Sequence, residues 1–440
     1  AGDPHLHTHV VISNKAKTTL DGKWRSLDGR PMHAAVVALS ELHEAVFADH
    51  MTLIFGVEWE ARDMGRDRSP AWAITAVPES LVTEFSSRAR HIDIETDRLI
   101  DEYVAAHGRR PTPAALMKLR AQATLLTRPD KHVRSLADLT AEWRTRATTI
   151  LGRDATRWAI DTTDNDRPLL LRADDIPLDV IRDIGCSVVE TVGEKRSTWR
   201  KWNLMAEASR QTMGWRFATM TDRETVITMV TDAAQLASLR LSPPELSLSP
   251  VVFRRGDGTS VFRPVNSAIF TSEVQLAAED RLLERSSDLT GPTVALAAVA
   301  RVTRKPDADG LVLGEDQAEA LTRIAVSGRM LDVLVGPAGA GKTTAMNALR
   351  RAWEAEHGTG SVVGLAPSAV AAQVLADDLG IETENTAMWW QNHLTKGLNF
   401  TAGQLVIVDE ASLAGTLSLD RIAGLAQQAG AKVLLVGDYA

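Results

Sequence analysis

The chain has 440 residues, of which 44% are hydrophobic and 24% are charged, as is typical of soluble globular domains. At roughly 100–200 residues per domain, this length predicts two to four domains. The net charge of −8 argues mildly against a broad nucleic-acid-binding surface, which is usually basic. We find neither a signal peptide nor an apolar run long enough to span a bilayer, so we expect a cytoplasmic protein without membrane insertion.

A single cysteine, Cys186, excludes an internal disulfide and agrees with a reducing compartment. We expect it to be a small buried apolar side chain. The chain starts with Ala1 and stops at Ala440, directly after a predicted strand. Because the edge of a parallel sheet would lose its covering helix there, we expect a fragment of a longer protein.

The amino-terminal part mixes strand and helix signals. Residues 5–13 alternate and end in β-branched side chains, which predicts a strand, and the turn dipeptides that follow predict a hairpin over 5–30. Residues 33–55 have apolar side chains at helical spacing. Residues 78–107 predict one long helix or two shorter ones, and residues 108–135 predict a linker followed by a basic helix.

The middle of the chain is predicted to be mostly helical, with one hairpin formed by Val251–Arg254 and Ser260–Arg263. Lys195–Trp202 alternates basic residues with tryptophans. Such a segment binds single strands by stacking and charge, or it forms an amphipathic helix that buries its tryptophans, and we favour the helix. We also expect Trp389 and Trp390 in the core.

Beyond the charged stretch Arg301–Asp309, predicted strands and helices alternate, which is typical of a parallel α/β sheet. The expected strands are 333–335, 362–365, 405–408 and 433–436. A first helix is expected to begin at about Gly314, and a second one, after a Gly-rich turn, to end at about Glu356. Two more helices are expected over 369–379 and 417–429.

A phosphate-binding pattern follows the first of these strands. Residues 336–343 match G-x-x-x-x-G-K-[ST] without deviation. Glycines let successive backbone N–H groups face the phosphates, and the helix N-terminus adds its dipole. Lys342 brings a charge to the β- and γ-phosphates, and Thr343 offers a hydroxyl to Mg²⁺. The predicted contacts to ATP are Gly336, Pro337, Ala338, Gly339, Ala340, Gly341, Lys342, Thr343 and Thr344.

A second element of the site is a pair of carboxylates after the predicted strand Leu405–Val408. Ligands bind at the carboxyl ends of strands in open α/β sheets. Asp409 fits the residue that holds Mg²⁺, and Glu410 fits the base that positions the attacking water. We therefore assign catalysis to Lys342, Asp409 and Glu410.

The order of these motifs resembles that of superfamily 1 helicases. By that resemblance, Gln317 is the adenine-reading glutamine ahead of the P-loop, and Pro367 and Ser368 contact single-stranded DNA. Gly437 and Asp438 resemble the opening of the motif that couples ATP to DNA. The resemblance implies an ATP-dependent DNA helicase.

Three histidines near the amino terminus, His5, His7 and His9, follow one another at every second position. On a strand they would share one face, where neutral imidazoles could converge on one metal ion. The other interpretation is a solvated His-rich edge.

The segment Asp3–Asn14, followed by Asp21–Arg30, resembles the three-histidine motif of MobF-type conjugative relaxases. These proteins nick one plasmid strand with an amino-terminal tyrosine and unwind it with a superfamily 1 helicase domain. The resemblance implies a divalent metal (Mn²⁺, Mg²⁺ or Zn²⁺) and, as partners, single-stranded DNA, a plasmid transfer origin and the conjugation machinery. His7 and His9 match two metal ligands, whereas His5 stands where the family usually has glutamine.

The third ligand and the nucleophilic tyrosine are expected upstream of residue 1. Neither Tyr103 nor Tyr439 has the sequence context of that nucleophile. The residues 77–81 and 85–88 resemble the end of the relaxase domain. We thus divide the chain into a relaxase remnant (1–95), a mainly helical region (96–303) and a helicase domain (304–440).

The predicted fold is a parallel-sheet P-loop α/β domain, preceded by the helical region and an α+β remnant. We expect the isolated chain to bind ATP without nicking or unwinding DNA. Two alternatives remain: a RecD-like helicase or ATPase with an unrelated amino-terminal domain, and an ATP-switched DNA-binding module without motor activity. A tyrosine cluster upstream of residue 1 would favour the first interpretation over the RecD-like one.

Overall fold

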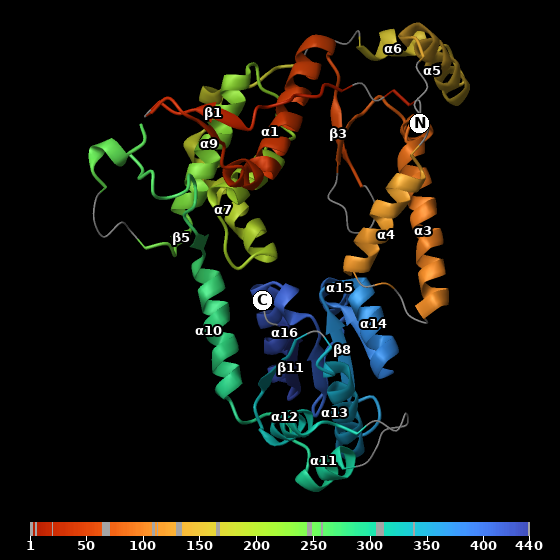
Figure 1. Cartoon of the computed structure of the whole chain (residues 1–440), viewed down its shortest axis with the longest axis vertical. Coiled ribbons are helices and arrows are strands. Elements are labelled where there is room, and N and C mark those ends of the chain that lie inside the picture. Colours follow the sequence, from red (N-terminus) through yellow and green to blue (C-terminus); the bar gives the residue numbers. More distant parts are fainter. Residues whose placement is uncertain are drawn as a thin grey trace. The chain divides into compact units, whose positions relative to one another are not determined.

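The computed structural model describes residues 3–4, 7–19, 21–63, 71–107, 111, 113–128, 134–163, 168–243, 249–256, 258–304, 312–337 and 339–438 (Figure 1). The chain divides into two compact units. Unit 1 comprises Ala1–Ile181 and Ala208–Val230, and unit 2 comprises Arg182–Glu207 and Thr231–Ala440.

Unit 1 begins with an extended segment and a short hairpin. Strand β1 (Lys15–Lys17) pairs antiparallel with β2 (Trp24–Ser26), which confirms the predicted hairpin. The predicted strand over 5–13 is wrong for the described residues 7–13, which belong to no strand. Alternation alone does not make a strand, because a strand also needs a neighbouring backbone to pair with.

Helix α1 (Arg30–Phe55) confirms the helix predicted over 33–55 and ends at Gly56, whose φ of 65° is the left-handed conformation of a helix C-cap. Its small buried residues let other elements approach closely, and Ala45 and Ala48 form a core with Met213 and the partly buried Trp59 and Trp72. Trp59 and Trp72 come from strands β3 (Trp59–Arg62) and β4 (Ala71–Ile74), which form a second antiparallel hairpin.

The rest of the amino-terminal part is helical. The region predicted as one or two helices is two, α2 (Glu79–Glu84) and α3 (Ser87–His107). Helix α4 (Pro113–Leu126) confirms the helix predicted after the linker. Helices α5 (Leu136–Leu151) and α6 (Ala155–Thr163) follow, and they share a small core with α2 through Leu81, Ala147 and Ala155.

A buried ion pair joins two distant parts of unit 1. Arg223, which is fully buried, donates from Nε and Nη2 to the two carboxylate oxygens of Asp49 on α1, each at 2.7 Å. Its remaining N–H groups donate to the carbonyls of Thr212 (2.9 Å) and Trp215 (2.7 Å). Asp49 also accepts the Phe217 backbone N–H at 3.1 Å, so the pair has the additional hydrogen bonds that a buried charge needs.

Unit 2 contains a five-stranded, wholly parallel sheet in the order β7-β11-β10-β8-β9. Its strands are β7 (Leu331–Val335), β8 (Val362–Ala366), β9 (Glu382–Asn385), β10 (Leu405–Val408) and β11 (Lys432–Gly437). The helices that cover it are α11 (Leu296–Thr303), α12 (Glu315–Val326), α13 (Lys342–His357), α14 (Ala369–Leu379), α15 (Thr386–Lys396) and α16 (Thr416–Ala429). The predicted α/β fold is confirmed, although β9 and α15 were not predicted.

The two faces of the sheet bury alternate residues of the same strands. Leu405 and Ile407 of β10 pack with α11 to α14, whereas Val406 and Val408 pack in a second core that includes residues of α15 and α16. Because both faces are covered, the central strand is apolar throughout, as parallel sheets require.

Helix α10 (Glu273–Ser287) lies along α16. Arg281 and Arg285 both donate to the Asp420 carboxylate, at 2.6 Å each for their closest contacts. Burial alone would raise the pKa of Asp420, but the two guanidinium groups hold that pKa below its ordinary value. Gln275 at the other end of α10 donates to the Gly193 carbonyl at 2.6 Å, near the end of α7 (Leu178–Lys195).

Helices α7, α8 (Lys201–Gln211) and α9 (Met220–Leu236) form most of the predicted helical middle. The expected helix over Lys195–Trp202 is wrong, since residues 196–200 are irregular. The expected burial is confirmed for Trp199, which is 1% exposed and donates from Nε1 to the Ser238 hydroxyl at 3.1 Å. Cys186, expected to be buried, is exposed.

A small sheet follows α9. Strand β5 (Leu239–Arg240) pairs with β6 (Phe270–Thr271), and Trp199 pairs with Phe270 on the other side. The predicted hairpin over 251–263 is reduced to a single bridge between Arg254 and Ser260, because Val251–Phe253 forms a 3₁₀ turn instead. No helix within the described ranges is both long and apolar enough to cross a bilayer.

Candidate nucleotide site and histidine segment

The P-loop connects β7 to α13, as the sequence predicts. Gly339 and Gly341 have φ angles of 82° and 73°, a region that favours glycine. Gly341 is the N-cap of α13, so Lys342, Thr343 and Thr344 occupy its first turn. The backbone N–H groups of a first helical turn have no partner within the helix and attract anions. Ala338 lies outside the described residues.

Lys342 occupies the position expected of the phosphate-binding cation. Its Nζ donates to the carbonyl of Gly336 at 2.6 Å and to that of Pro337 at 3.2 Å. It also pairs with the Asp438 carboxylate. The ammonium is therefore held inside the loop by groups that a nucleotide phosphate would have to replace.

The two carboxylates predicted after β10 follow that strand directly. The Asp409 N–H donates to the Leu365 carbonyl of β8 at 2.9 Å, which fixes it beside the neighbouring strand. Burial raises the pKa of the Asp409 carboxyl. Burial also raises the pKa of Glu410, and the negative charges of Asp409 and Asp438 add to this shift. Such a cluster favours a bound cation, because a cation would relieve the repulsion.

Glu410 has a φ of 50°, the left-handed conformation that a residue with a Cβ seldom adopts. It precedes a 3₁₀ turn over Ala411–Leu413. Strain of this kind is commonly found where a side chain must be aimed at a site. Carboxylate and hydroxyl oxygens are the ligands that Mg²⁺ prefers, and Asp409 and Thr343 offer these groups.

Gln317 connects the start of α12 to the P-loop. Its Oε1 accepts the Gly314 N–H at 3.0 Å, and its Nε2 donates to the Ala340 carbonyl at 2.9 Å. A Cβ at Gly341 would lie 2.3 Å from this Nε2 and would displace the amide, and the φ of 73° also favours glycine there. The residue predicted to read adenine thus contacts the loop that is predicted to hold the phosphates.

Gly437 and Asp438 end β11 beside the P-loop, and the Gly437 carbonyl accepts the Gly336 N–H at 3.3 Å. A Cβ at Gly437 would lie 3.6 Å from the Ser412 backbone nitrogen, in ordinary contact. The P-loop and Asp438 are therefore direct neighbours.

Pro367 and Ser368 follow β8. The Ser368 hydroxyl accepts the Ala371 N–H at 3.1 Å and caps α14. Pro367 lines a hollow of about 410 Å³ together with Trp390, Arg421 and Lys195. Arg421 lies 5.4 Å from the Trp390 ring centroid and pairs with Glu194. Trp389 is buried as expected, at 6% exposure, whereas Trp390 is only partly buried, so its role in this hollow was not predicted.

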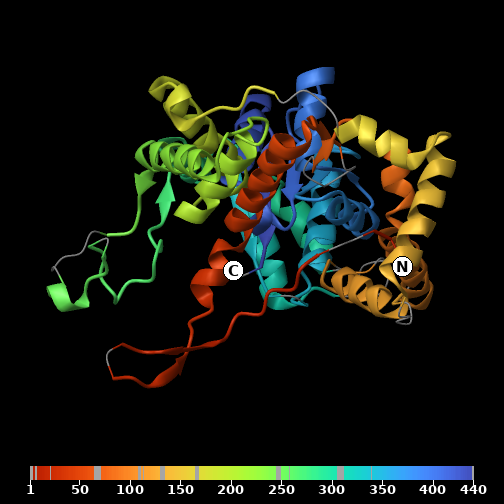
Figure 2. The same ribbon diagram turned by 90° about the horizontal axis from the view of Figure 1, so that it is seen from above.

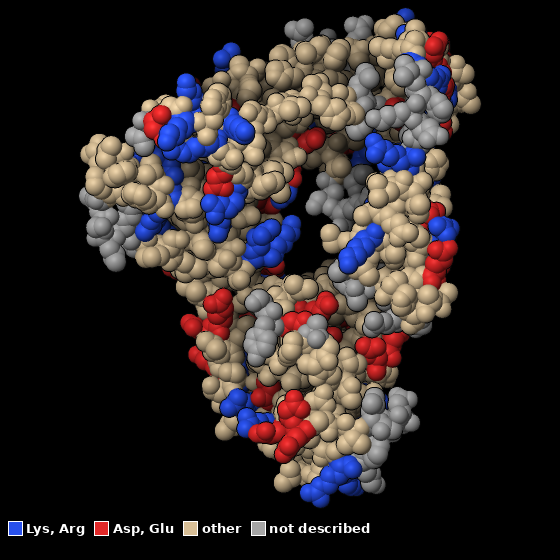
Figure 3. All heavy atoms as spheres, viewed as in Figure 1, with Lys and Arg blue, Asp and Glu red and all other residues tan. Residues whose placement is uncertain are grey.

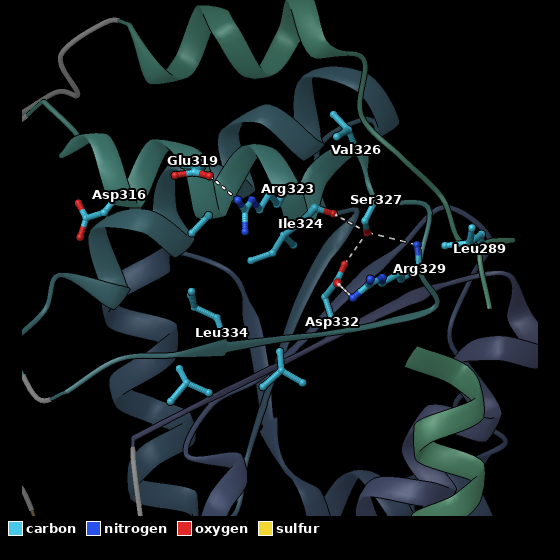
Figure 4. A pocket seen from close by; sticks show the side chains of 13 residues that line it. Leu289, Asp316, Glu319, Arg323, Ile324, Val326, Ser327, Arg329, Asp332 and Leu334 are labelled. Carbon is cyan, nitrogen blue, oxygen red and sulfur yellow. Dashed lines mark hydrogen bonds and ion pairs between the residues drawn. The ribbon is translucent and has the colours of Figure 1, made fainter. Parts of the chain in front are cut away.

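A larger hollow, of about 740 Å³, lies beside β7 and α12 (Figure 4). Its polar centre is Ser327, whose hydroxyl donates to Asp332 at 2.6 Å and accepts from the fully buried Lys432 at 2.7 Å. Burial lowers the pKa of Lys432 although Asp332 is its ion-pair partner. None of the P-loop or Asp409–Glu410 residues lines this hollow, so we do not assign the nucleotide to it.

The imidazoles of His7 and His9 meet in the extended segment before β1. Their Nε2 atoms are 3.1 Å apart. This is the distance of a hydrogen bond between the two rings, and it is close to the separation of about 3.3 Å between two nitrogens bound to one tetrahedral ion at about 2.0–2.1 Å. His5 lies outside the described residues. Within those residues no group of three or more metal-ligating side chains is found.

Asp3 anchors this histidine segment, a role that was not predicted. Its carboxylate accepts the Ser87 N–H at 3.0 Å and the Ser87 hydroxyl, and it pairs with Arg146 at 3.2 Å. Arg146 also donates to Glu84 at 2.8 Å and lies 4.6 Å from the Phe85 ring centroid. Burial opposes ionisation of Asp3, but these hydrogen bonds lower its pKa. The signal in the sequence was the Phe85–Arg88 motif, whose partner could not be inferred.

The two tyrosines do not join this segment in the described residues. Tyr103 is on α3, where its ring stacks on His107 with centroids 4.1 Å apart. Tyr439 lies outside the described residues.

Comparison with known families agrees with both motif sets. Residues 1–150 match the TrwC relaxase family, and residues 312–440 match an AAA domain family. The chain is also similar to conjugal transfer proteins TraA. It is 36% identical over 129 residues to the protein of Rhizobium radiobacter, and 38% identical over 127 residues to that of Agrobacterium fabrum; both matches cover 29% of this chain. A probable TraA of Sinorhizobium fredii is 35% identical over 160 residues, 36% of this chain.

These matches span only 11% to 13% of the length of the curated relatives. The two regions that match family models, residues 1–150 and 312–440, contain the histidine segment and the P-loop. The chain therefore has a region similar to the TrwC relaxase family followed by a region similar to an AAA domain family, which is the order that the resemblance to MobF-type relaxases implies.

Proposed function

We propose that this chain belongs to a cytoplasmic relaxase–helicase of conjugative DNA transfer, which nicks one strand at a plasmid transfer origin and unwinds it 5′ to 3′ with ATP. The observation that carries the proposal is that one chain contains two adjacent histidine rings within the region that matches a relaxase family, and a complete P-loop sequence with two partly buried carboxylates within the region that matches an AAA domain family. Single-stranded DNA, the transfer origin and the conjugation machinery are the proposed partners.

In this proposal Lys342 leaves Asp438 and the loop carbonyls to hold the β- and γ-phosphates of ATP. Thr343 and Asp409 hold Mg²⁺, which supplies positive charge against the developing charge on the phosphates. Glu410 positions the attacking water. Its pKa is raised by burial and by neighbouring carboxylates, as suits a group that accepts a proton. Gln317 and Gly437 complete the nucleotide-binding set.

We further propose that single-stranded DNA passes over Pro367 and Ser368. The support is the hollow beside Pro367, where the partly exposed Trp390 offers a ring for a base. Lys195 lies at the same hollow and adds positive charge next to that ring, and Arg421, which is paired with Glu194, lies over the ring. A basic groove with an aromatic platform is the usual means of binding single strands without sequence preference.

The two alternatives make different predictions. A RecD-like helicase would share the ATP site but would not require the histidine segment. The match of residues 1–150 to the TrwC relaxase family therefore favours the first proposal. An ATP-switched DNA-binding module would change its DNA affinity with nucleotide and show no turnover even when joined to a second RecA-like domain.

The proposal predicts that these 440 residues bind ATP but neither nick nor unwind DNA by themselves. Nicking needs a tyrosine oxygen that attacks phosphorus, and the ring of Tyr103 instead stacks on His107. The family resemblance implies a second RecA-like domain that supplies an arginine worth about 10³–10⁵ in rate. The measurements are a covalent protein–DNA adduct on a denaturing gel and DNA-stimulated phosphate release. An adduct lost with Tyr103→Phe, or robust turnover lost with Glu410→Gln, would contradict this prediction.

The histidine segment should bind a divalent metal weakly. Two ligands cannot close a four-coordinate site, so we expect calorimetry with Mn²⁺ and Zn²⁺ to give weak binding that His7→Ala plus His9→Ala abolishes. His43→Ala on α1 serves as a histidine control. Tight binding that survives the double replacement would refute the assignment. Tight binding lost only with His5→Ala would show that His5 supplies the third ligand.

A further inference from the structure

The described residues 239–243, 249–256 and 258–271, here called the arm, form a basic surface feature of unit 2 that the proposed function does not use. The sequence from Leu239 to Thr271 has four arginines and two carboxylates, Glu245 and Asp257, and so a net charge of +2 in a chain of net charge −8. Figure 2 shows it extending away from β5 and β6. In Figure 3 acidic side chains gather over α10, the helix that follows β6.

The base of the arm is fixed by backbone pairing. The Trp199 N–H donates to the Phe270 carbonyl at 2.9 Å, and the Phe270 N–H donates back at 2.8 Å. Thr271 donates from its hydroxyl to the Ser197 carbonyl at 2.8 Å. Because Trp199 is fully enclosed, the arm starts from a rigid support.

Two arginines of the arm, Arg254 and Arg255, are held by neutral groups. Arg255 donates to the carbonyls of Ser260 (2.6 Å) and Arg263 (2.8 Å), and Arg254 donates to that of Ser249 at 2.8 Å. Arg240 is exposed. No ion pair joins Arg240, Arg254 or Arg255 to a carboxylate of the described residues. Carbonyls orient a guanidinium without cancelling its charge, so these groups remain available to an anion.

A hollow of about 660 Å³ opens at these side chains. Arg240, Arg255 and Arg263 line it, together with the hydroxyl-bearing Thr259 and Ser267. Guanidinium and hydroxyl groups are the usual donors to phosphate oxygens of nucleic-acid backbones.

Two aromatic rings lie on the same arm. Phe253 is 43% exposed and Phe262 is 71% exposed, and their ring centroids are 5.2 Å apart. Neither ring belongs to a buried apolar cluster among the described residues. Exposed rings interleaved with arginines provide stacking surfaces for unpaired bases, which a base-paired duplex does not offer.

We propose that the arm is a second binding site for single-stranded DNA, separate from the Pro367 hollow, in which the arginines contact phosphates and Phe262 stacks on a base. This inference rests on the proposed function, in which single-stranded DNA is the partner. A site on a projecting arm would hold the strand at a distance from the ATPase residues. A motor gains from such a contact because the strand stays bound to the arm while the Pro367 hollow releases it.

The test measures binding of a fluorescent oligo(dT) and of a duplex of equal length by anisotropy over a range of salt concentrations. Arg240→Glu should weaken oligo(dT) binding at least tenfold and lower the salt slope by about 0.7, the value for one single-strand phosphate contact. Phe262→Ala should weaken oligo(dT) binding about fivefold or more and leave the duplex unaffected. Both positions are exposed, so the fold should be preserved, which circular dichroism and thermal melting check.

Matched controls change exposed side chains elsewhere in unit 2, an arginine for Arg240 and a large apolar residue for Phe262. Arg323→Glu on α12 and Leu283→Ala on α10 replace side chains that are 78% and 65% exposed, and neither should change oligo(dT) binding. Unchanged binding in both arm variants overturns the inference. Equal weakening of duplex and oligo(dT) by Arg240→Glu, with no effect of Phe262→Ala, overturns the single-strand assignment. Binding of ATP·Mg²⁺ is measured in parallel and tests the proposed function independently. If the chain failed to bind ATP·Mg²⁺, the expected effects of the arm variants on oligo(dT) binding would be unchanged.

Discussion

Replacing Lys342 with alanine is expected to weaken ATP·Mg²⁺ binding by more than tenfold, or about 1.4 kcal/mol. The Lys342 ammonium lies among the Gly336 and Pro337 carbonyls, where the phosphates of a nucleotide belong. Without it, the backbone N–H groups of the first turn of α13 remain, but the point charge on the β- and γ-phosphates is lost. Titration with a fluorescent ATP analogue in the presence of Mg²⁺ measures the change.

Lys396→Ala is the matched control for this experiment. Lys396 is an exposed lysine in the last turn of α15, so its removal changes the net charge equally and leaves the P-loop intact. Superimposable titration curves for Lys342→Ala and the parent chain would show that the nucleotide binds elsewhere.

Removing either partner of the buried Asp49–Arg223 pair is expected to destabilise unit 1 by about 3–5 kcal/mol. Asp49→Ala leaves a fully buried guanidinium without its counter-charge, and Arg223→Met leaves a buried carboxylate. The double variant Asp49→Leu/Arg223→Met should recover most of this loss, because it leaves no uncompensated charge. Amide hydrogen exchange of α1 reports the stability of this unit without assuming one transition for the whole chain.

The exposed Glu41–Arg210 pair provides the comparison. It joins the same helix α1 to the 208–230 segment at 2.7 Å, but both side chains are more than 30% exposed. Glu41→Ala should therefore cost less than about 1 kcal/mol. Similar losses for Glu41→Ala and Asp49→Ala would mean that the buried pair contributes no more than a surface contact.

The conformation of the P-loop segment was predictable because its information is local. A strand, eight loop residues and a helix start specify the P-loop, and each of these is set by neighbours in the sequence. The parallel sheet followed from alternation of apolar strands with helices. Strand β9 escaped prediction because Glu382–Asn385 is polar and lies at the edge of the sheet, where apolar side chains are not required.

Long-range partners were not predictable from one sequence. Asp49 and Arg223 are 174 positions apart, and nothing near either residue indicates the other. The pair of Asp3 and Arg146, which anchors the histidine segment, was unpredictable for the same reason. The expected burial of Cys186 was wrong because its helix α7 exposes that face, and helical spacing alone did not reveal which face is covered.

The contact between Gln317 and Gly341 restricts how this protein can evolve. Since a Cβ at Gly341 would meet the Gln317 amide, a larger residue there would push that amide away from the P-loop. The displaced amide would lose its hydrogen bonds to the Gly314 N–H and the Ala340 carbonyl. Substitutions at Gly341 and at Gln317 are therefore expected to be coupled, because each position limits what the other can tolerate.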